Sequence, residues 1–307
     1  MTTPASTIEK VGVIGLGAMG RPLVNSLLEA GYSVHAYDIS AAAIDAAVQQ
    51  GATAAASPAD LAAGVDLFLT VLPYGEDVEA ALFAPGGAAE GARRGAIFVD
   101  ASTIDPMTIN RLAQPLQQKG IDVLDAGLAG SPKMARERRL TLLVGGDEAV
   151  FDRAAGVLRC LADQGKLLYT GQLGSAKVVK LLNNMVGAVQ MAAISEAFNL
   201  AVKAGVDPKV LYDGMSGSMG NCWALHVRPP YPGIKPGSPA DLDFEPDFSV
   251  DYMIKDLSYA LQTGRSLEAA LLLAGQVHKL YLATSARGEG AKDFAAIVHT
   301  VQALSKP

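Results

Sequence analysis

Short runs of apolar residues alternate with amphipathic segments through the first half of the chain. The amphipathic segments, such as residues 22–30 before Gly31, predict helices. Most of the apolar runs lack polar alternation, which is typical of parallel strands buried on both faces of a sheet. We expect these strands at residues 11–14, 33–37, 67–71, 97–99, 123–124, 140–144 and 167–169. This order predicts a Rossmann-like, doubly wound α/β domain.

The pattern becomes helical after Gly174. Residues 175–204 contain no proline and a single glycine, and they predict one interdomain helix about 45 Å long. Residues 227–248 are rich in proline, glycine and aspartate and predict a long ordered loop or lid. Further helices are expected at residues 208–215, 249–263, 267–282 and 293–304. We therefore expect a Rossmann-like domain over residues 1–172 and an all-helical C-terminal domain over residues 173–307.

The composition fits a folded protein of two domains. Half of the 307 residues are hydrophobic and 18% are charged, which excludes disorder as the overall state. Lys and Arg number 25 against 31 for Asp and Glu, so the net charge is −6, without a basic tract. This balance argues against a nucleic-acid or anionic-membrane binder. Residues 1–10 are polar and no stretch approaches a membrane span, so we expect a soluble cytoplasmic protein.

Cysteine and histidine are scarce. The two cysteines, Cys160 and Cys222, cannot form a disulfide framework and do not have metal-ligand spacing. The four histidines are scattered, with no pair spaced as ligands on one helix: His35, His226, His278 and His299. We expect no metal centre.

A glycine-rich turn follows the first predicted strand. Gly15, Gly17 and Gly20 form the pattern Gly-x-Gly-x-x-Gly at the start of a predicted helix. The first glycine permits a tight turn, the second lets a pyrophosphate approach the backbone, and the third allows close packing of helix and strand. The first domain is therefore predicted to bind a dinucleotide, and glycines that serve only a turn are the alternative. The expected contacts are Gly15, Leu16, Gly17, Ala18, Met19 and Gly20.

The second predicted strand is followed by Asp38, near the position where such domains carry an acidic residue. A carboxylate there accepts hydrogen bonds from ribose hydroxyls and repels a 2′-phosphate. The next residues, Ile39 and Ser40, offer no arginine to that phosphate. The expected cofactor is therefore NAD rather than NADP. A second possible role for Asp38 is to cap the following helix.

Several motifs resemble those of a known family. They read Gly15-Leu-Gly-Ala-Met-Gly20, Leu72-Pro73, Asp100-Ala-Ser-Thr-Ile-Asp-Pro106, Gly174-Ser-Ala-Lys-Val-Val-Lys180-Leu-Leu-Asn-Asn184, Asn221-Cys-Trp223 and Lys255-Asp-Leu257. On these motifs, in this order, the chain resembles the β-hydroxyacid dehydrogenases, and most closely the 3-hydroxyisobutyrate dehydrogenases.

The resemblance implies further contacts to the nicotinamide and its ribose. These positions are Leu72, Pro73, Ser102, Thr103 and, on the cofactor side, Lys255. Leu72 and Thr103 each follow a predicted strand, and ligands of open α/β sheets bind at the carboxyl ends of strands. Thr103 could instead cap the helix that opens near Asp105.

Lys180 is the candidate general acid/base. It lies in an otherwise apolar stretch, and burial lowers the pKa of a lysine toward working pH. Asn184 lies one helical turn further on the same face and would hold the substrate, with Asn183 assisting. Lys177 also shares a face with Asn184, so the choice of Lys180 rests on the family motif as well. For Lys177 we prefer a solvated position on the helix surface.

The loop expected to bind the substrate departs from the family pattern. The family usually has Asp-Ala-Pro-Val-Ser-Gly-Gly, where this chain has Gly127 for proline, Ala129 for serine and Ser131 for the second glycine. Backbone N–H groups of Ala129, Gly130 and Ser131 could still bind a carboxylate, with the hydroxyl lost or supplied by Ser131. Four cations follow: Lys133, Arg136, Arg138 and Arg139. They would fit a larger or more acidic substrate, but a solvated basic turn is the preferred interpretation.

The last candidates are Cys222, Trp223 and His226, which precede the proline-rich loop. Trp223, the only tryptophan, could wall the substrate pocket, with simple helix packing as the alternative. Cys222 has no adjacent base and is expected to be a buried thiol. His226 lacks an obvious carboxylate partner, so a His–Asp dehydrogenase mechanism is not supported.

Together these features predict an oxidoreductase that transfers a hydride between NAD and a small β-hydroxy acid. The alternatives are an imine reductase, which usually carries Asp or Tyr at the position of Lys180, a dehydrogenase of phosphorylated or sulfonated hydroxy acids, and a cofactor-binding regulator without turnover. The long helix carries more apolar surface than two small domains can cover, so a homodimer or homotetramer is expected.

Overall fold

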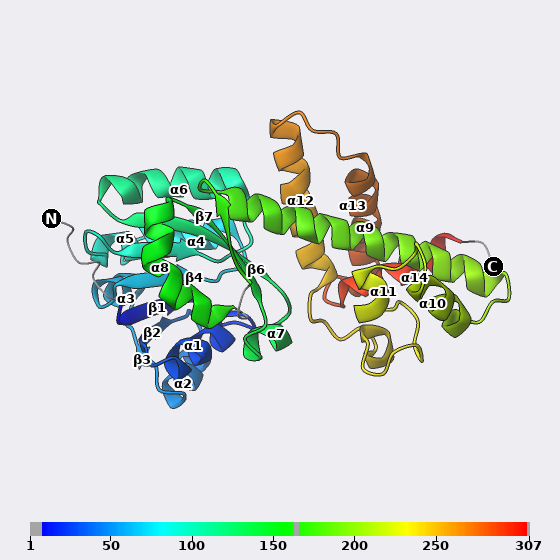
Figure 1. Ribbon diagram of the computed structural model, residues 1–307, viewed down its shortest axis with the longest axis horizontal. Helices are drawn as coiled ribbons and strands as arrows, with labels where there is room; N and C mark the ends of the chain where they lie inside the picture. The colour runs from blue at the N-terminus through cyan, green and yellow to red at the C-terminus, as the bar shows by residue number, and fades with distance from the viewer. Residues whose placement is uncertain (1–7, 163–165, 306–307) are drawn as a thin grey trace. The chain divides into compact units, whose positions relative to one another are not determined.

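The computed structural model describes residues 8–162 and 166–305. The first half of the chain forms an eight-stranded sheet of order β3-β2-β1-β4-β5-β6-β7-β8 (Figure 1). Its strands are β1 (Lys10–Ile14), β2 (Ser33–Tyr37), β3 (Thr53–Ala54), β4 (Leu67–Thr70), β5 (Ile97–Asp100), β6 (Asp122–Ala129), β7 (Thr141–Gly146) and β8 (Leu167–Gly171). All seven predicted strands are present, and the Rossmann-like architecture is confirmed.

The sheet differs from the sequence prediction in two places. The edge strand β3 has only two residues, both exposed, so it leaves no apolar run in the sequence. β7 is antiparallel to β6, whereas the other neighbouring pairs are parallel. Residues 130–140 between these two strands are too few for the crossover of roughly a dozen residues that a parallel pair requires.

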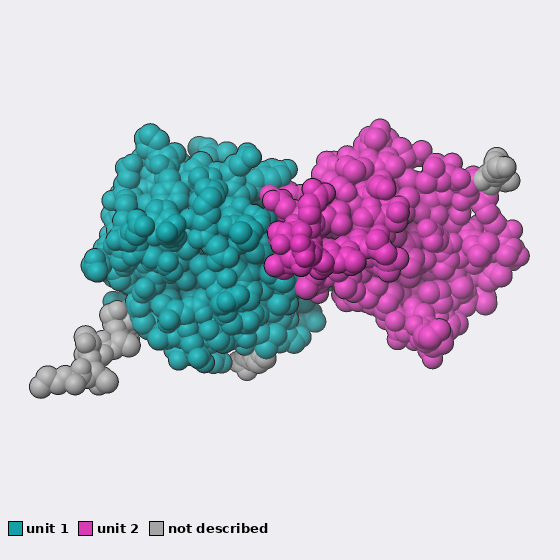
Figure 2. All heavy atoms as spheres, turned by 90° about the horizontal axis from the view of Figure 1, so that it is seen from above, with its two compact units in different colours: residues 1–180 teal, residues 181–307 magenta. Residues whose placement is uncertain are grey.

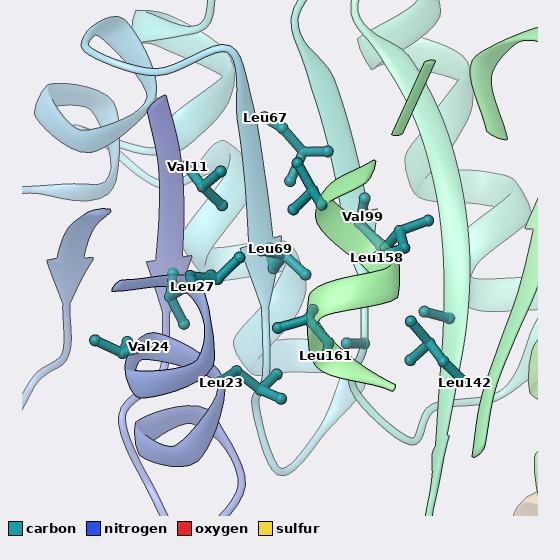
Figure 3. Packing of buried hydrophobic residues seen from close by; sticks show 14 of the residues in the cluster. Val11, Leu23, Val24, Leu27, Leu67, Leu69, Val99, Leu142, Leu158 and Leu161 are labelled. Atoms are coloured by element: carbon teal, nitrogen blue, oxygen red, sulfur yellow. The ribbon is translucent and has the colours of Figure 1, made fainter. Parts of the chain in front are cut away.

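Helices cover both faces of the sheet. They are α1 (Gly20–Glu29), α2 (Ala41–Gln49), α3 (Pro58–Ala63), α4 (Gly75–Phe83), α5 (Ala88–Gly91), α6 (Pro106–Gln118), α7 (Pro132–Arg136) and α8 (Glu148–Leu161). On one face, leucines of α1 and α8 pack against β1, β4 and β5 (Figure 3). On the other, α3, α4 and α6 pack around Phe68 and Phe98, whose stacked rings are 5.1 Å apart. The sheet is therefore buried on both sides, and its strand ends remain as the place for a ligand.

The long helix predicted from the sequence is α9 (Ser175–Lys203). The chain divides into two compact units, residues 1–180 and 181–307 (Figure 2). Because α9 spans Ser175–Lys203, it begins in the first unit and continues in the second. The predicted domain border after residue 172 precedes this helix, whereas the compact units divide within it. The difference arises because the first turns of α9 contact the strand ends of the first unit.

The expectation that no stretch of the chain approaches a membrane span is wrong for α9. By length and composition alone α9 is apolar enough to cross a membrane, with a mean hydropathy of 1.4 over its 18-residue window. However, 44% of that window is buried in the structure. Met191 and Phe198 of α9 also belong to the core of the second unit. The core helix of a folded domain can be as long and as apolar as a membrane span, so length and apolarity do not distinguish the two.

The second unit is helical, as expected. After α9 it contains α10 (Pro208–Ser216), α11 (Trp223–Val227), α12 (Val250–Ser266), α13 (Leu272–Thr284) and α14 (Ile297–Leu304), with short helical turns at Pro239–Leu242, Ser285–Glu289 and Phe294–Ala296. The loop between α11 and α12 is ordered by Arg228, which is 4% exposed and forms ion pairs with Asp247 and the buried Asp293. The proline-rich segment is therefore an ordered loop despite its polar composition.

Candidate functional site

The glycine turn joins β1 to α1 and leaves a space beside the helix start. Gly15 has a backbone φ of 96°, which residues with a side chain rarely adopt. A Cβ on Gly20 would lie 1.8 Å from the Gly15 carbonyl oxygen, so that position requires glycine for packing. A Cβ on Gly17 would meet nothing within 4 Å, and Gly17 is exposed. This open space next to the N–H groups at the start of α1 fits a bound pyrophosphate.

Asp38 follows β2 and turns back to the glycine turn. Its Oδ2 accepts a hydrogen bond from the Leu16 N–H at 2.6 Å, and its Oδ1 accepts one from the Ser40 N–H at 2.8 Å. The side chain that caps α2 is Ser40, which accepts from the Ala43 N–H. The alternative role of Asp38 as the helix cap is therefore wrong. Each of its oxygens keeps a further lone pair for a ribose hydroxyl.

Ser102 connects the carboxyl ends of β4 and β5. Its buried hydroxyl accepts a hydrogen bond from the Leu72 N–H at 2.9 Å. Asp105 caps α6 through both carboxylate oxygens, so the alternative role of Thr103 as that cap is wrong. Thr103 is half-buried and Pro73 is exposed. The four predicted positions therefore lie at the edge of the sheet where this fold binds ligands.

The predicted substrate loop continues β6. Ala129 is the last residue of the strand and pairs with Thr141 of β7. Gly130 has a φ of 146°, and Ser131 caps α7 by accepting a hydrogen bond from the Met134 N–H at 3.3 Å. The Ser131 hydroxyl is thus engaged as an acceptor, while its proton can still be donated.

The basic turn after this loop is exposed. The Arg138 guanidinium donates to Glu29 at 2.5 Å, and that of Arg139 donates to Glu137 at 2.9 Å. Arg138 has a φ of 54°, where the family usually has glycine. These contacts fit a solvated basic turn and do not support an additional anion subsite.

Two lysines lie one turn apart at the start of α9, and both are buried. Lys180 is 9% exposed, and a Cβ on Gly127 would lie 3.0 Å from the Lys180 Cβ. Glycine in place of the family proline therefore lets α9 pack closely on β6. Lys177 is 1% exposed, and its Nζ lies 2.9 Å from Asp100 Oδ2 in an ion pair. The expectation of a solvated Lys177 is wrong.

Asp125, which sequence reasoning missed, joins β6 to the start of α9. Its two carboxylate oxygens accept hydrogen bonds from the Gly174 and Lys177 N–H groups at 2.8 and 2.9 Å. N–H groups at a helix start lack partners within the helix, so Asp125 satisfies them. Burial raises the pKa of the Asp125 carboxyl, although the Lys177 charge and both hydrogen bonds act in the opposite direction. The only signal in the sequence is an aspartate within an apolar strand.

In the second unit a carboxylate orients Asn184. The Asn184 Nδ2 donates to Asp256 Oδ2 at 2.6 Å, and the Asn183 amide donates to Asn184 Oδ1 at 3.1 Å. Asp256 is 1% exposed and also pairs with Lys255 at 3.5 Å. Because α9 is continuous, Asn184 follows Lys180 by one helical turn on the same face. Sequence reasoning missed Asp256, although it stands next to Lys255 in the Lys-Asp-Leu motif.

The remaining candidates surround α11. Trp223 opens this helix and is 52% exposed, with the Arg228 guanidinium 5.9 Å from its ring. Cys222 is half-buried rather than buried. His226 contacts the Asn221 amide oxygen at 2.5 Å and the Tyr212 hydroxyl at 3.2 Å, and neither group is a carboxylate. Within residues 8–162 and 166–305, no three His, Cys, Asp or Glu side chains are grouped so as to hold a metal ion.

Known proteins share this arrangement. A family model described as the NAD binding domain of 6-phosphogluconate dehydrogenase matches residues 10–171. A second, described as NAD-binding of NADP-dependent 3-hydroxyisobutyrate dehydrogenase, matches residues 174–301. The mitochondrial 3-hydroxyisobutyrate dehydrogenase of Drosophila melanogaster is 35% identical over 94% of this chain and 88% of its own length. The chain belongs to the 3-hydroxyisobutyrate dehydrogenase family.

Other members of the family agree with this assignment. A probable 3-hydroxyisobutyrate dehydrogenase of Mycobacterium bovis is 36% identical over 95% of this chain and 98% of its own length. The solved structure of the Mycobacterium tuberculosis 3-hydroxyisobutyrate dehydrogenase with L-serine has a TM-score of 0.90 at 35% identity, covering 96% of this chain and 100% of that one. An imine reductase from Pseudomonas sp. has a TM-score of 0.59 at 22% identity, covering 95% of this chain and 99% of that one, and shares the fold alone.

The family assignment settles several sequence expectations. Membership of the β-hydroxyacid dehydrogenases is confirmed, and so is the enzyme class, an NAD(P)-dependent oxidoreductase. The arrangement of a Rossmann-like half, a long helix and a helical half is also confirmed. The choice between the two dinucleotides, and the roles of individual residues, belong to the proposal that follows.

Proposed function

We propose that this protein oxidises a small β-hydroxy acid such as 3-hydroxyisobutyrate, with NAD as the hydride acceptor and Lys180 as the general acid/base. One observation carries the proposal: a buried lysine on α9 packs beside Gly127 of β6, one helical turn before Asn184. Burial keeps bulk water away from the amine, and a lysine that replaces the Asp or Tyr usual in imine reductases suits a hydroxyl substrate.

In this reaction Lys180 would remove the hydroxyl proton while the carbon–oxygen double bond forms, and would return it in the reverse direction. NAD, when bound, supplies the acceptor for the hydride that leaves the same carbon. Asn184, whose amide is oriented by Asp256, would hold the substrate beside Lys180. Backbone N–H groups at Ala129, Gly130 and Ser131 would bind the substrate carboxylate, and Trp223 would form an apolar wall.

The preference for NAD over NADP rests on Asp38. Its carboxylate is fixed by the Leu16 and Ser40 N–H groups, so it would stay in place beside the ribose. A fixed negative charge there favours ribose hydroxyls and repels a 2′-phosphate. The other cofactor contacts we propose are the glycine turn, Leu72, Pro73, Ser102, Thr103 and Lys255.

A substrate with a single carboxylate is favoured over a phosphorylated or sulfonated one. The four cations that would have extended the substrate site, Lys133, Arg136, Arg138 and Arg139, are all exposed, and the last two are paired with glutamates. The loss of the family serine at Ala129 removes a hydroxyl but leaves the backbone donors. We therefore expect activity on small hydroxy acids whose carboxylate is bound mainly by N–H groups.

The test measures NADH formation by the full chain with a panel of small β-hydroxy acids, and repeats the assay with NADP. Lys180→Met is expected to lower kcat by about 10² to 10⁴, the range of general acid/base catalysis, while NADH binding stays close to the parent. Retention of most of the rate would show that Lys180 is not the base. Better turnover with NADP would contradict the role of Asp38, and turnover of imines alone would contradict the substrate class.

Three further expectations accompany this proposal. We propose that α9 is the interior helix of a soluble protein, because its first turns carry two buried lysines and its later turns supply core residues. A cytoplasmic location and a homodimer or homotetramer stay predictions from the sequence. Light scattering of the purified protein tests the oligomeric state, since a monomer would contradict the predicted homodimer or homotetramer.

A further inference from the structure

Lys177 lies one turn before the proposed general base and is the more deeply buried of the two lysines. We propose that Lys177 is a positioning residue, which holds the cofactor-side loop at residues 100–103 and the first turn of α9 in one fixed arrangement. This inference rests on the proposed function, because it assigns to Lys177 the placing of Ser102 and Thr103 on one side and of Lys180 on the other.

The Lys177 ammonium is surrounded by oxygens from the end of β5, the loop after it and β6. Its Nζ donates to the backbone carbonyls of Asp100 at 2.7 Å, Ser102 at 2.6 Å and Ala126 at 2.9 Å. A fourth oxygen, Asp100 Oδ2, lies at 2.9 Å. A single cation thus connects the end of β5, the loop after it and β6, and its own backbone connects all three to α9.

Side-chain contacts extend this arrangement to the neighbouring strand. Asp100 Oδ1 accepts hydrogen bonds from the Thr70 hydroxyl at 2.8 Å and the Ser102 N–H at 3.1 Å. The Ser102 hydroxyl in turn accepts the Leu72 N–H. Lys177 therefore acts, through Asp100 and Ser102, on both loops that are proposed to line the nicotinamide.

Charge explains why a cation is needed here. Asp100 and Asp125 are both fully buried, and Asp125 accepts the Lys177 N–H. Two buried carboxylates require compensation, and the Lys177 ammonium is the cation that contacts Asp100. A neutral side chain of similar length would fill the space but would leave the three carbonyls without their donor and the Asp100 carboxylate without its counter-charge.

Lys177 is not a second base. An ammonium has three N–H donors, and the backbone carbonyls of Asp100, Ser102 and Ala126 accept all three, while Asp100 Oδ2 is held by charge alone. Its side chain is 1% exposed, so it does not reach a ligand. Its effect on the reaction is indirect, through the positions of Ser102, Thr103 and Lys180.

The test uses a background in which Asp100, the carboxylate that contacts the Lys177 ammonium, is not left as an unpaired buried charge. Lys177→Met/Asp100→Asn removes both charges at once, and Lys177→Gln/Asp100→Asn restores an uncharged donor. Lys119→Met is the control, because Lys119 also donates to a backbone carbonyl, that of Ala89, at 2.8 Å, but away from the strand ends. Circular dichroism checks folding, fluorescence titration gives the NADH affinity, and steady-state assays give kcat and both KM values.

We expect the Met double variant to bind NADH about tenfold more weakly than the parent, with a matching rise in the KM for NAD and little change in the KM for the hydroxy acid. The Gln double variant is expected to recover part of the affinity, and the Lys119 variant to match the parent. Parent-like NADH affinity in the folded Met double variant would overturn the proposal. Failure of both double variants to fold would also overturn it, because Lys177 would then serve only stability.

The two proposals fail in different ways. If the parent binds NADH but oxidises no β-hydroxy acid, the proposed function is wrong, and the NADH affinities still decide the role of Lys177. If Lys180→Met loses turnover and NADH affinity together, Lys180 does not act as a base alone, and the Lys177 double variants still decide the role of Lys177.

Discussion

In the first unit the glycine turn between β1 and α1 is shaped by close backbone contacts, whereas in the second unit Asn184 is held by the side chain of Asp256. Three of the six residues of the glycine turn have no side chain, and its shape follows from close backbone contacts such as that between Gly20 and the Gly15 carbonyl. Asn184 depends instead on one hydrogen bond between side chains that are 72 residues apart in the sequence.

This difference indicates how each half tolerates change. A site built from backbone allows few substitutions, because an added atom must move the chain itself. A site built from side-chain hydrogen bonds loses one contact at a time, so its losses are graded. We therefore expect the largest effects in the glycine turn and smaller ones at the buried carboxylates.

Gly20→Ala gives the largest expected effect. Its Cβ would lie 1.8 Å from the Gly15 carbonyl oxygen, so the turn must open. We expect a loss of about 3 kcal/mol in the free energy of unfolding, the upper end of the cost of overpacking, measured by urea or thermal unfolding. Gly17→Ala is the control, because its Cβ meets nothing within 4 Å. Equal stability of the two variants would show that the turn is not built by close backbone contact.

Gly17→Ala sharpens the same comparison when cofactor binding is measured. Its methyl group would stand in the open space at the start of α1 where we place the pyrophosphate. We expect the Kd for NADH to rise about tenfold, or ~1.4 kcal/mol, with the unfolding midpoint unchanged. NADH fluorescence titration checks this result. Unchanged affinity would place the cofactor elsewhere.

Asp256→Asn tests the hydrogen bond between side chains that orients Asn184 in the second unit. The new amide can present a donor to the Asn184 Nδ2, so the orientation of Asn184 is no longer fixed. We expect the KM for the hydroxy acid to rise by about tenfold or somewhat less, while the KM for NAD stays near the parent value. The matched control is Asp213→Asn, an exposed helical aspartate in the same unit that pairs with Lys209. A similar KM in both variants would contradict the role of Asp256.

The first unit was largely predictable from the sequence because its signals are local. The strand runs lie within short windows, and the structure confirms them. The glycine pattern and Asp38 also lie within short windows, and the structure brings them into contact through the Leu16 N–H. β7 was predicted as a strand, but its antiparallel direction depends on the length of the connection after β6, which periodicity does not report. β3 is too short to leave a pattern.

The start of α9 was the hardest part to predict. Apolar and polar residues are interleaved there, so periodicity does not identify the buried face. The structure buries Lys177 and Lys180, whereas Val179 and Leu182 are 41% and 43% exposed. Lys177 is buried because Asp100, Asp125 and Ala126 approach it from strands more than fifty residues earlier. Such contacts depend on the fold and leave no signal near Lys177 in the sequence.

Asp125→Asn gives the smallest expected effect and tests whether the buried carboxylate at α9 is costly. The folded-state pKa of Asp125 is raised by burial and by Asp100, against the lowering effect of Lys177 and two N–H donors. A raised pKa means that the folded protein holds the proton more tightly, so this group contributes stability at low pH that is lost as pH rises through the folded pKa. Asparagine has no such dependence.

The variant should therefore gain stability relative to the parent as pH rises from about 4 to 7, while staying within about 1 kcal/mol of it overall, the scale of one hydrogen bond. Urea unfolding at several pH values measures the difference, and Asp213→Asn controls for the change in net charge. A difference that moves in the opposite direction would mean that Lys177 and the N–H donors outweigh burial. In that case the charged carboxylate itself would hold the start of α9, and the first unit would depend on side-chain charge as much as on its backbone.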